Sequence, residues 1–314
     1  KIVGVTGTNG KTTCSYLLEQ LFAQAGHKLG VMGTVSYRWP GHNEAALLTT
    51  PDALSVHAML AARNEDGVRI APWIASTHYG PLESEAHSVV RGMAFMGHED
   101  FARRGLDFFI NRYNDDGYLT TGYTLIGTGW HLWALGEFHE LNRDEAWLRG
   151  VAPEVDRVCE WILAQREKTR RELADGRRPP EFGLMPPGVL ADWGVYSHYF
   201  YLNGNYYAGL KWAGRALGEI GWTDAADIVS RADEFRADIA RAFQYVQGQA
   251  PVLPLRDGTW VPAYPTQLYC PMPIGDLYPD DDAGRSWCYD VELGAHHLVP
   301  MGVLDPRDPA VDWM

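Results

Sequence analysis

The chain carries near its start the stretch Gly4-Val5-Thr6-Gly7-Thr8-Asn9-Gly10-Lys11-Thr12-Thr13, which decides the fold of its first part. Apolar residues over 2–5 predict a short buried strand, and apolar residues after the stretch recur at helical spacing. A strand, a glycine turn and a helix in this order bring backbone N–H groups and a helix N-terminus around one anion. The sequence therefore predicts a phosphate site, in which Lys11 neutralises nucleotide phosphates and Thr12 completes a Mg²⁺ shell.

The loop is shorter than the common P-loop, because Gly7 lies only three residues before Gly10. In this form it resembles the ATP-binding loop of the Mur ligases, the amide ligases that build peptidoglycan precursors. The segment Thr49-Thr50-Pro51-Asp52 resembles part of the UDP-N-acetylmuramoyl-tripeptide synthetases of that family. The resemblance implies ATP and Mg²⁺ as cofactors and a cytoplasmic location for this part. It also implies phosphorylation of a carboxylate by ATP, followed by attack of an amine on the acyl phosphate.

The resemblance assigns roles to single residues. The nucleotide-binding set is Gly7, Thr8, Asn9, Gly10, Lys11, Thr12 and Thr13. Thr12 is also the expected metal ligand, and Thr49 and Thr50 are expected between Mg²⁺ and the UDP-sugar peptide. Two alternatives stay open: the loop is a glycine-rich turn that binds nothing, or Thr49 and Thr50 form a helix N-cap before Pro51.

Residues 1–60 are predicted to be a short α/β P-loop βαβ fragment. The helix is expected to end at Gly26, and a second strand is expected over 29–34. Past about residue 60 the alternation of strands and helices stops. Because one βαβ unit cannot cover both faces of a parallel sheet, this part is predicted to be the opening of an ATPase domain. Residues 61–71 form the junction to a different pattern, which occupies 72–314.

From about residue 83 the sequence predicts paired helices. The expected pairs are 84–96 with 100–113, 127–141 with 145–170, 205–220 with 224–246, and a fourth that begins at 287–299. Joints within the pairs are short, whereas three connections between pairs are long: 114–126, 171–204 and 247–286. In an array of antiparallel hairpins all long connections lie at one end, so these aromatic-rich loops are expected to share one face.

This organisation resembles the six-hairpin (α/α)6 toroid of many inverting glycoside hydrolases. The resemblance is carried by the hairpin joints and by three segments: Asn114-Asp115-Asp116-Gly117-Tyr118, Gly127-Thr128-Gly129-Trp130, and 183–188 leading to Asp192-Trp193. The fold class expected for the whole chain is therefore mostly α. It is a partial toroid, with three and a half recognisable hairpins, preceded by the βαβ fragment. The resemblance implies a carbohydrate ligand and no cofactor for the toroid.

Cleavage of a sugar by the inverting route needs two carboxyl groups roughly 6.5–9.5 Å apart. The candidate catalytic residues are Asp192, Glu83, Glu85 and Glu292. Each has a structural alternative: Asp192 caps a turn, Glu83 sits in a first helical turn, or Glu292 pairs with an arginine.

Aromatic rings provide stacking surfaces for sugars. The candidate substrate-binding rings are Tyr118, Trp193 and Tyr196. By contrast, Trp130, Trp133, Trp161 and Trp212 fall within expected helices and are predicted to lie in the core. The charged run 166–178 is predicted to be a solvated helix end.

Composition excludes some functions. A formal charge of −13 argues against nucleic acid as a partner. No apolar run approaches the roughly 18 residues of a transmembrane helix. Cys14, Cys159, Cys270 and Cys288 lack metal-ligand spacing and are predicted to be free thiols, and the histidines also lack ligand spacing.

The two resemblances allow three explanations: a natural fusion, a ligase throughout, or two unrelated fragments joined together. The third is favoured, because both resemblances are specific and both are truncated. The main function expected from the larger part is glycoside hydrolysis. The alternatives are an ATP-dependent amide ligase of peptidoglycan precursor synthesis and a non-catalytic carbohydrate-binding scaffold.

Overall fold

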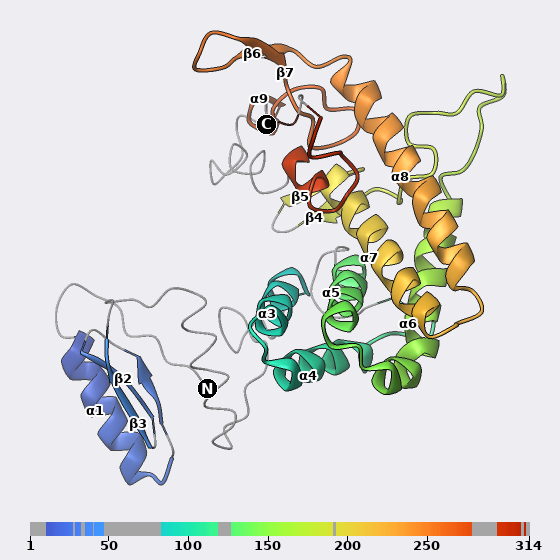
Figure 1. Ribbon diagram of the computed structural model, residues 1–314. Coiled ribbons are helices and arrows are strands. Elements are labelled where there is room, and N and C mark those ends of the chain that lie inside the picture. The colour runs from blue at the N-terminus through green and yellow to red at the C-terminus, as the bar shows by residue number, and fades with distance from the viewer. Residues whose placement is uncertain are drawn as a thin grey trace. The chain divides into compact units, whose positions relative to one another are not determined.

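The computed structural model describes residues 11–27, 29–32, 35–39, 41–46, 83–118, 127–190, 193–277, 294–308 and 311. These residues are mostly helical, as the sequence predicted (Figure 1). The chain divides into two compact units, Lys1–Gly105 and Leu106–Met314, and the boundary falls inside helix α4 (Glu99–Ile110). The expected strand over 2–5, the phosphate loop up to Gly10 and the segment 49–52 lie outside the described residues.

The first unit begins with helix α1 (Lys11–Gln24), followed by a small antiparallel sheet. Strand β1 (Val31–Met32) pairs with β2 (Ser36–Trp39), and β2 pairs with β3 (His42–Ala45). The second expected strand is thus shorter than 29–34, and the β2–β3 hairpin was not expected at all. Its sequence signal is Gly41, whose φ of 86° suits the tight turn between the two strands.

Arg38 on β2 holds α1 against the sheet. Its Nε donates to the two carboxylate oxygens of Glu19 at 3.0 and 2.9 Å, and its guanidinium carbon lies 4.0 Å from the centre of the Tyr16 ring. Tyr37 and Trp39 of the same strand are buried. A fork-shaped guanidinium matches a carboxylate in geometry, so this contact fixes the orientation of α1 as well as its distance from the sheet.

The expected helix pairs are present with small shifts in their bounds. The described helices are α3 (Glu83–Phe95) with α4, α5 (Gly127–Asn142) with α6 (Glu145–Glu167), and α7 (Phe200–Glu219) with α8 (Ala225–Gln247). Helix α7 begins five residues before the expected residue 205, and α6 ends before 170. Asp144 caps α6 by accepting the Trp147 N–H at 3.0 Å, as an acid at this joint should.

The remaining elements differ from the expectation. The described part of the fourth expected helix is a 3-10 helix, η1 (Ala295–Leu298). The long connections contain helix α9 (Ile274–Leu277) and two small hairpins, which sequence periodicity did not indicate. These hairpins are β4 (Gly188–Leu190) with β5 (Trp193–Ser197), and β6 (Val252–Pro254) with β7 (Trp260–Pro262). The described helices do not confirm a six-hairpin toroid.

Helix α7 lies between α5 and α8 and is buried along most of its length (Figure 1). Glycines allow α5 and α7 to approach at backbone distance. A Cβ added at Gly129 would lie 2.8 Å from the backbone of Asn205, and one at Gly136 would lie 2.6 Å from the backbone carbon of Trp212. On the α7 side, Gly209 meets the backbone of Gly129 in the same way. The α5–α7 contact therefore requires residues without a side chain at these positions.

His131 on α5 is buried and ties the end of α4 to α5. Its Nε2 lies 3.2 Å from the Leu106 carbonyl oxygen, and its Nδ1 contacts the Tyr113 hydroxyl. Because a carbonyl only accepts, Nε2 carries the proton and the Tyr113 hydroxyl donates to Nδ1. Burial lowers the pKa of His131 to about 4, so the ring is neutral at physiological pH.

We expect Gly136→Ala to destabilise the helical unit by about 1–3 kcal/mol, because the new methyl group meets the backbone of Trp212. Gly150→Ala on α6 is the matched control. Gly150 is exposed, and a Cβ there would meet nothing within 4 Å, so alanine should stabilise the protein by about 1 kcal/mol. Urea unfolding followed by circular dichroism measures both changes. Equal effects of the two substitutions would contradict close backbone contact at Gly136.

We expect the free energy of unfolding to fall as the pH falls from about 6.5 to about 4. Over this range the unfolded chain protonates His131 and the folded chain does not, so the proton favours unfolding. The loss attributable to His131 is about 3 kcal/mol. His131→Asn should remove this part of the pH dependence in urea titrations at several pH values. His98→Asn should keep it, because His98 lies in the α3–α4 joint and is only half-buried. An unchanged pH profile in His131→Asn would contradict the assignment.

Candidate functional site

The described part of the nucleotide site is the first turn of α1. The structure places Lys11 at the first residue of this helix, and Thr12 and Thr13 follow it with exposed side chains. The Ser15 hydroxyl donates to the Thr12 carbonyl oxygen at 2.7 Å. The turn contains no acidic residue, so the partial positive charge of the helix N-terminus is not neutralised there. This end of α1 favours an anion such as a phosphate.

The role of Thr12 as a metal ligand stays a prediction. In the part of the chain that the structure describes, no three His, Cys, Asp or Glu side chains lie together in a way that could hold a metal ion. A hydroxyl that completes a nucleotide-bound Mg²⁺ shell needs no such cluster, because the nucleotide phosphates supply further oxygen ligands. The three described cysteines, Cys14, Cys159 and Cys270, are free thiols, as predicted.

In the second unit the short joints of two hairpins meet. Arg149, just after the α5–α6 joint, donates to the carbonyl oxygen of Ile220 at the α7–α8 joint at 2.8 Å. Glu219 accepts from His139 at 3.1 Å and also pairs with Arg143. These contacts place both short joints at one end of the helices, as the loop lengths predicted.

The second and third long connections meet as well. The N–H of Phe200 donates to the Thr266 carbonyl oxygen at 3.1 Å, and the N–H of Leu268 donates to the His198 carbonyl oxygen at 3.0 Å. The Tyr269 hydroxyl donates to Glu181 Oε2 at 2.5 Å. Segments about 70 to 90 residues apart in the sequence are therefore joined at the N-terminus of α7.

Of the candidate sugar-binding rings, Tyr118 lies against an aromatic neighbour. Its ring centre is 5.1 Å from that of Trp161 on α6, and Trp161 lies 6.2 Å from the buried ring of Tyr206 on α7. Trp161 is half-buried and not fully in the core. Tyr196 on β5 is 73% exposed. Trp193 begins β5, and the structure describes its backbone pairing with Leu190 only.

The candidate carboxylates are not brought together by the described geometry. Asp192 and Glu292 lie outside the described residues, and Glu83 and Glu85 fall in the first turn of α3, with only their backbone described. The position of Glu83 matches its structural alternative. In the 114–118 segment, Asp116 accepts the Tyr118 N–H at 3.1 Å and so holds the turn. Catalysis by these acids stays a prediction.

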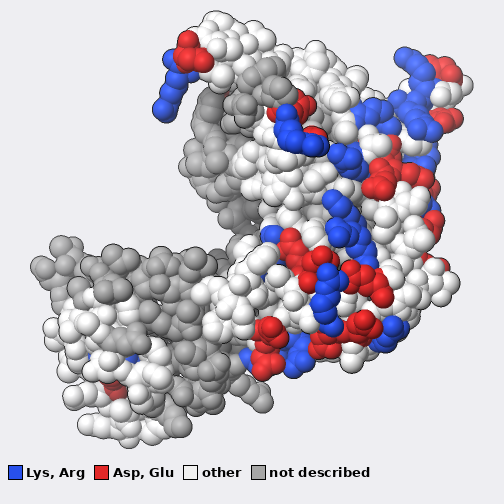
Figure 2. All heavy atoms as spheres, viewed as in Figure 1, with Lys and Arg blue, Asp and Glu red and all other residues white. Residues whose placement is uncertain are grey.

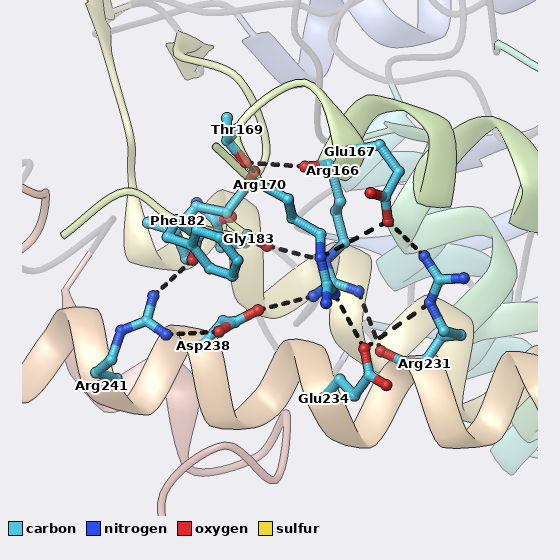
Figure 3. Close-up of polar contacts among 12 residues, drawn as sticks. Arg166, Glu167, Thr169, Arg170, Phe182, Gly183, Arg231, Glu234, Asp238 and Arg241 are labelled. Carbon is cyan, nitrogen blue, oxygen red and sulfur yellow. Dashed lines mark hydrogen bonds and ion pairs between the residues drawn. The ribbon is translucent and has the colours of Figure 1, made fainter. Parts of the chain in front are cut away.

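A buried arginine missed by the sequence analysis holds the second long connection in place (Figure 3). Arg166 on α6 is fully buried. Its Nε donates to the Gly183 carbonyl oxygen at 2.9 Å, its Nη1 to the Arg231 carbonyl oxygen at 3.1 Å, and its Nη2 to Asp238 Oδ2 at 3.0 Å. The guanidinium thus joins α6, α8 and the connection between α6 and α7.

The charged run 166–178 is therefore not simply a solvated helix end, and the prediction is wrong for its first residue. Burial lowers the pKa of Arg166 to about 10, and the charge of Asp238 opposes this shift, so the guanidinium stays protonated at neutral pH. Arg241 extends the cluster by donating to Asp238 Oδ1 at 2.7 Å and to the Phe182 carbonyl oxygen at 2.6 Å. Asp238 is paired on both oxygens, which offsets the cost of its burial.

The residue at position 183 must be glycine for two reasons. Its φ is 78°, and a Cβ there would lie 2.0 Å from Asp238 Oδ2. A sequence signal for the cluster did exist. Arg166 continues the apolar spacing of Val155, Cys159 and Ile162 on α6, and Asp238 lies beside Phe235 on the apolar stripe of α8. A charged residue at a position that the helix period assigns to the core indicates a buried ion pair.

Basic and acidic side chains lie next to each other over much of the helical unit (Figure 2). Arg170 pairs with Glu234 at 2.9 Å, Arg231 with Glu167 at 2.5 Å, and Arg177 with Asp175 at 2.7 Å. Within the described residues, no helix is both long enough and apolar enough to cross a membrane.

Comparison with known proteins gives a match to one family. The Mur ligase middle domain matches residues 5–80, which include the glycine loop, α1 and the β1–β3 sheet. The match extends past residue 60, where the sequence analysis placed the end of the Mur ligase-like part.

The chain is also similar to curated proteins named UDP-N-acetylmuramoyl-L-alanyl-D-glutamate–2,6-diaminopimelate ligase. The protein from Lawsonia intracellularis is 54% identical over 77 residues, which cover 24% of this chain and 16% of the relative. Those from Prochlorococcus marinus (strain NATL2A) and Thermosynechococcus vestitus are 31% and 33% identical, over 55% and 49% of this chain. The chain covers 33% and 32% of their lengths, so it spans at most about a third of these relatives.

These findings support the Mur ligase resemblance and do not support the glycosidase resemblance. The alternative function, an ATP-dependent ligase, is thus better supported than glycoside hydrolysis. A match over 55% of the chain cannot fit within Lys1–Gly105, so the similarity to the Prochlorococcus protein reaches into the second unit.

We expect Arg166→Met to destabilise the helical unit by about 3–5 kcal/mol, because it leaves Asp238 buried with one partner fewer. Arg170→Met, four residues away, breaks a partly exposed pair with Glu234 and should cost about 1 kcal/mol or less. Thermal and urea unfolding of the two variants measure the difference. If both variants lose a similar free energy of unfolding, the contribution of Arg166 to stability does not depend on its burial.

Proposed function

We propose that the first part of this chain binds the phosphates of ATP as the opening of a Mur ligase middle domain. The observation that carries the proposal is the family match over residues 5–80, which begins at the glycine loop and runs through α1. The first turn of α1 supports it independently, because it exposes Thr12 and Thr13 and holds no acid that would repel a phosphate.

In this proposal the loop residues act mainly through their backbone. The N–H groups from Gly7 to Gly10 and the N-terminus of α1 surround the nucleotide phosphates. The Lys11 ammonium neutralises the β- and γ-phosphates, and the Thr12 hydroxyl contributes to the Mg²⁺ shell. The bound Mg²⁺ would neutralise charge on the phosphates during transfer.

The reaction class follows from the names of the similar proteins, which are ligases of 2,6-diaminopimelate. Such a ligation transfers the γ-phosphoryl group of ATP to a substrate carboxylate and releases ADP. The amine of the second substrate then attacks the acyl phosphate, an amide forms, and inorganic phosphate leaves. For this chain we propose the nucleotide-handling part of that sequence, with positioning and charge neutralisation as its catalytic contribution.

The Arg38–Glu19 contact supports the same proposal from the structural side. The Nε of Arg38 lies 2.9–3.0 Å from the carboxylate oxygens of Glu19, and this contact attaches α1 to the sheet. The N-terminus of the helix therefore has a defined direction. A helix that presents its first N–H groups to a phosphate needs such anchoring, because the dipole effect falls off within one turn.

Lys11→Ala should weaken binding of ATP by about tenfold or more, because it removes a charge-assisted hydrogen bond worth about 1.5–3 kcal/mol. Titration calorimetry with ATP and Mg²⁺ on the full chain measures this effect. Lys168→Ala is the control, since Lys168 follows the last residue of α6 and its exposed ammonium donates only to the Gln165 side chain at 2.6 Å among the contacts of the described residues. Equal affinity of the Lys11→Ala variant and the parent chain would reject a functional phosphate loop.

A further inference from the structure

Helix α1 carries an apolar stripe that the described part of the first unit leaves uncovered. The stripe recurs at helical spacing and consists of Cys14, Leu17, Leu18, Leu21 and Phe22. The side chains of Leu17, Leu21 and Phe22 are 58%, 63% and 37% exposed. Of the α1 residues whose side chains the structure describes, 12–24, none is buried. A stripe of this width on a helix is typical of a face that packs against another layer of the fold.

The sheet beside α1 contacts the opposite side of the helix (Figure 1). The Nε of Arg38 on β2 donates to the carboxylate oxygens of Glu19 at 3.0 and 2.9 Å, and its guanidinium carbon lies 4.0 Å from the centre of the Tyr16 ring. The helical period of 3.6 residues places Tyr16 and Glu19 together, on the side away from Leu17 and Leu21. The β1–β3 sheet therefore meets the polar side of α1.

The stripe is uncharged as well as apolar. Lys11 and Glu19 are the only charged residues of α1, and Glu19 is paired with Arg38. A charged or strongly polar partner would lose its hydration on such a surface, whereas an apolar partner gains free energy there. Helices that follow a phosphate loop cover the face of a parallel sheet, whose strands are rich in aliphatic residues. The chemistry of the stripe thus fits the face of a sheet.

We propose that the apolar stripe of α1 is a docking surface for the aliphatic face of a β-sheet, supplied by segments of a Mur ligase that this chain does not match. The proposal rests on the proposed function through the family match over residues 5–80. The match to the Lawsonia intracellularis protein covers 16% of that relative, so most of its sequence lies outside the match. Among the described residues of the first unit, β1–β3 is the only sheet, and it lies on the other side of α1.

Docking would complete the attachment of the phosphate-binding helix. At present Arg38 holds α1 from one side only, through Glu19. A sheet packed on Leu17 and Leu21 would hold the same helix from the other side, and the first turn with Lys11 would then have a fixed position. A phosphate site at a helix N-terminus benefits from this, because the dipole effect falls off within one turn.

Titration calorimetry tests the proposal with the full chain and a Lawsonia intracellularis ligase from which the 77 matched residues are deleted, without nucleotide. We expect saturable binding with a negative change in heat capacity, which marks burial of apolar surface. Leu17→Glu and Leu21→Glu should each weaken binding about tenfold or more, because each buries a charge in an apolar contact. Gln20→Glu adds the same charge at an exposed position off the stripe and should leave binding unchanged.

Two controls keep the result separate from folding and from ATP binding. Leu17 and Leu21 are exposed in the chain alone, so glutamate there should leave its fold intact, which circular dichroism checks. Lys11→Ala should weaken ATP binding and leave docking unchanged, because docking needs no nucleotide. Docking that persists in this variant supports the surface whether or not the parent chain binds ATP.

Co-expression of the two chains followed by gel filtration is the second measurement, because it also detects a ligase fragment that folds only on docking. Three outcomes would overturn the proposal. The first is the absence of a complex in both experiments, and the second is equal weakening by Leu17→Glu and Gln20→Glu. The third is self-association of the chain that Leu17→Glu abolishes and that excludes the ligase fragment, since a second copy would then cover the stripe.

Discussion

The close approach of α5 and α7 is the constraint on which the rest of the helical unit depends. Gly129, Gly136 and Gly209 bring the two backbones to a distance that no Cβ would allow. Helix α7 packs against α5 on one side and α8 on another, and the second and third long connections meet at its N-terminal end. Close packing of this kind has few alternatives, since each added methyl group must displace backbone.

A buried ion pair holds the α6–α7 connection against α6 and α8. Arg166 and Asp238 lie on different helices, and the arginine also reaches the connection at Gly183. A buried charge pair of this kind contributes less net stability than its short distances suggest, because desolvation costs oppose the attraction. The ion pair instead makes the position of the α6–α7 connection specific. Only one position of this connection lets the Gly183 carbonyl, the Arg231 carbonyl and the Asp238 carboxylate all accept from the Arg166 guanidinium.

The candidate anion-binding site of the first unit lies at the N-terminus of α1. At α1 the partial charge of a helix N-terminus and a glycine loop is suited to nucleotide phosphates, and the family match over residues 5–80 gives that site a biochemical context. The similarity to a 2,6-diaminopimelate ligase extends beyond the first unit, and the comparisons do not support a glycosidase.

The sequence by itself predicted the α3–α4, α5–α6 and α7–α8 helix pairs, their short joints and the helix that begins near Lys11. These follow from local rules: apolar period, turn residues such as Gly26, and caps such as Asp144. The β2–β3 hairpin was missed although its turn residue Gly41 is local, and the fourth helix is shorter than predicted. The partners of Arg166, by contrast, depend on residues far apart in the chain. Only the tertiary structure decided which groups accept hydrogen bonds from Arg166, because Gly183, Arg231 and Asp238 come from segments that no sequence period connects.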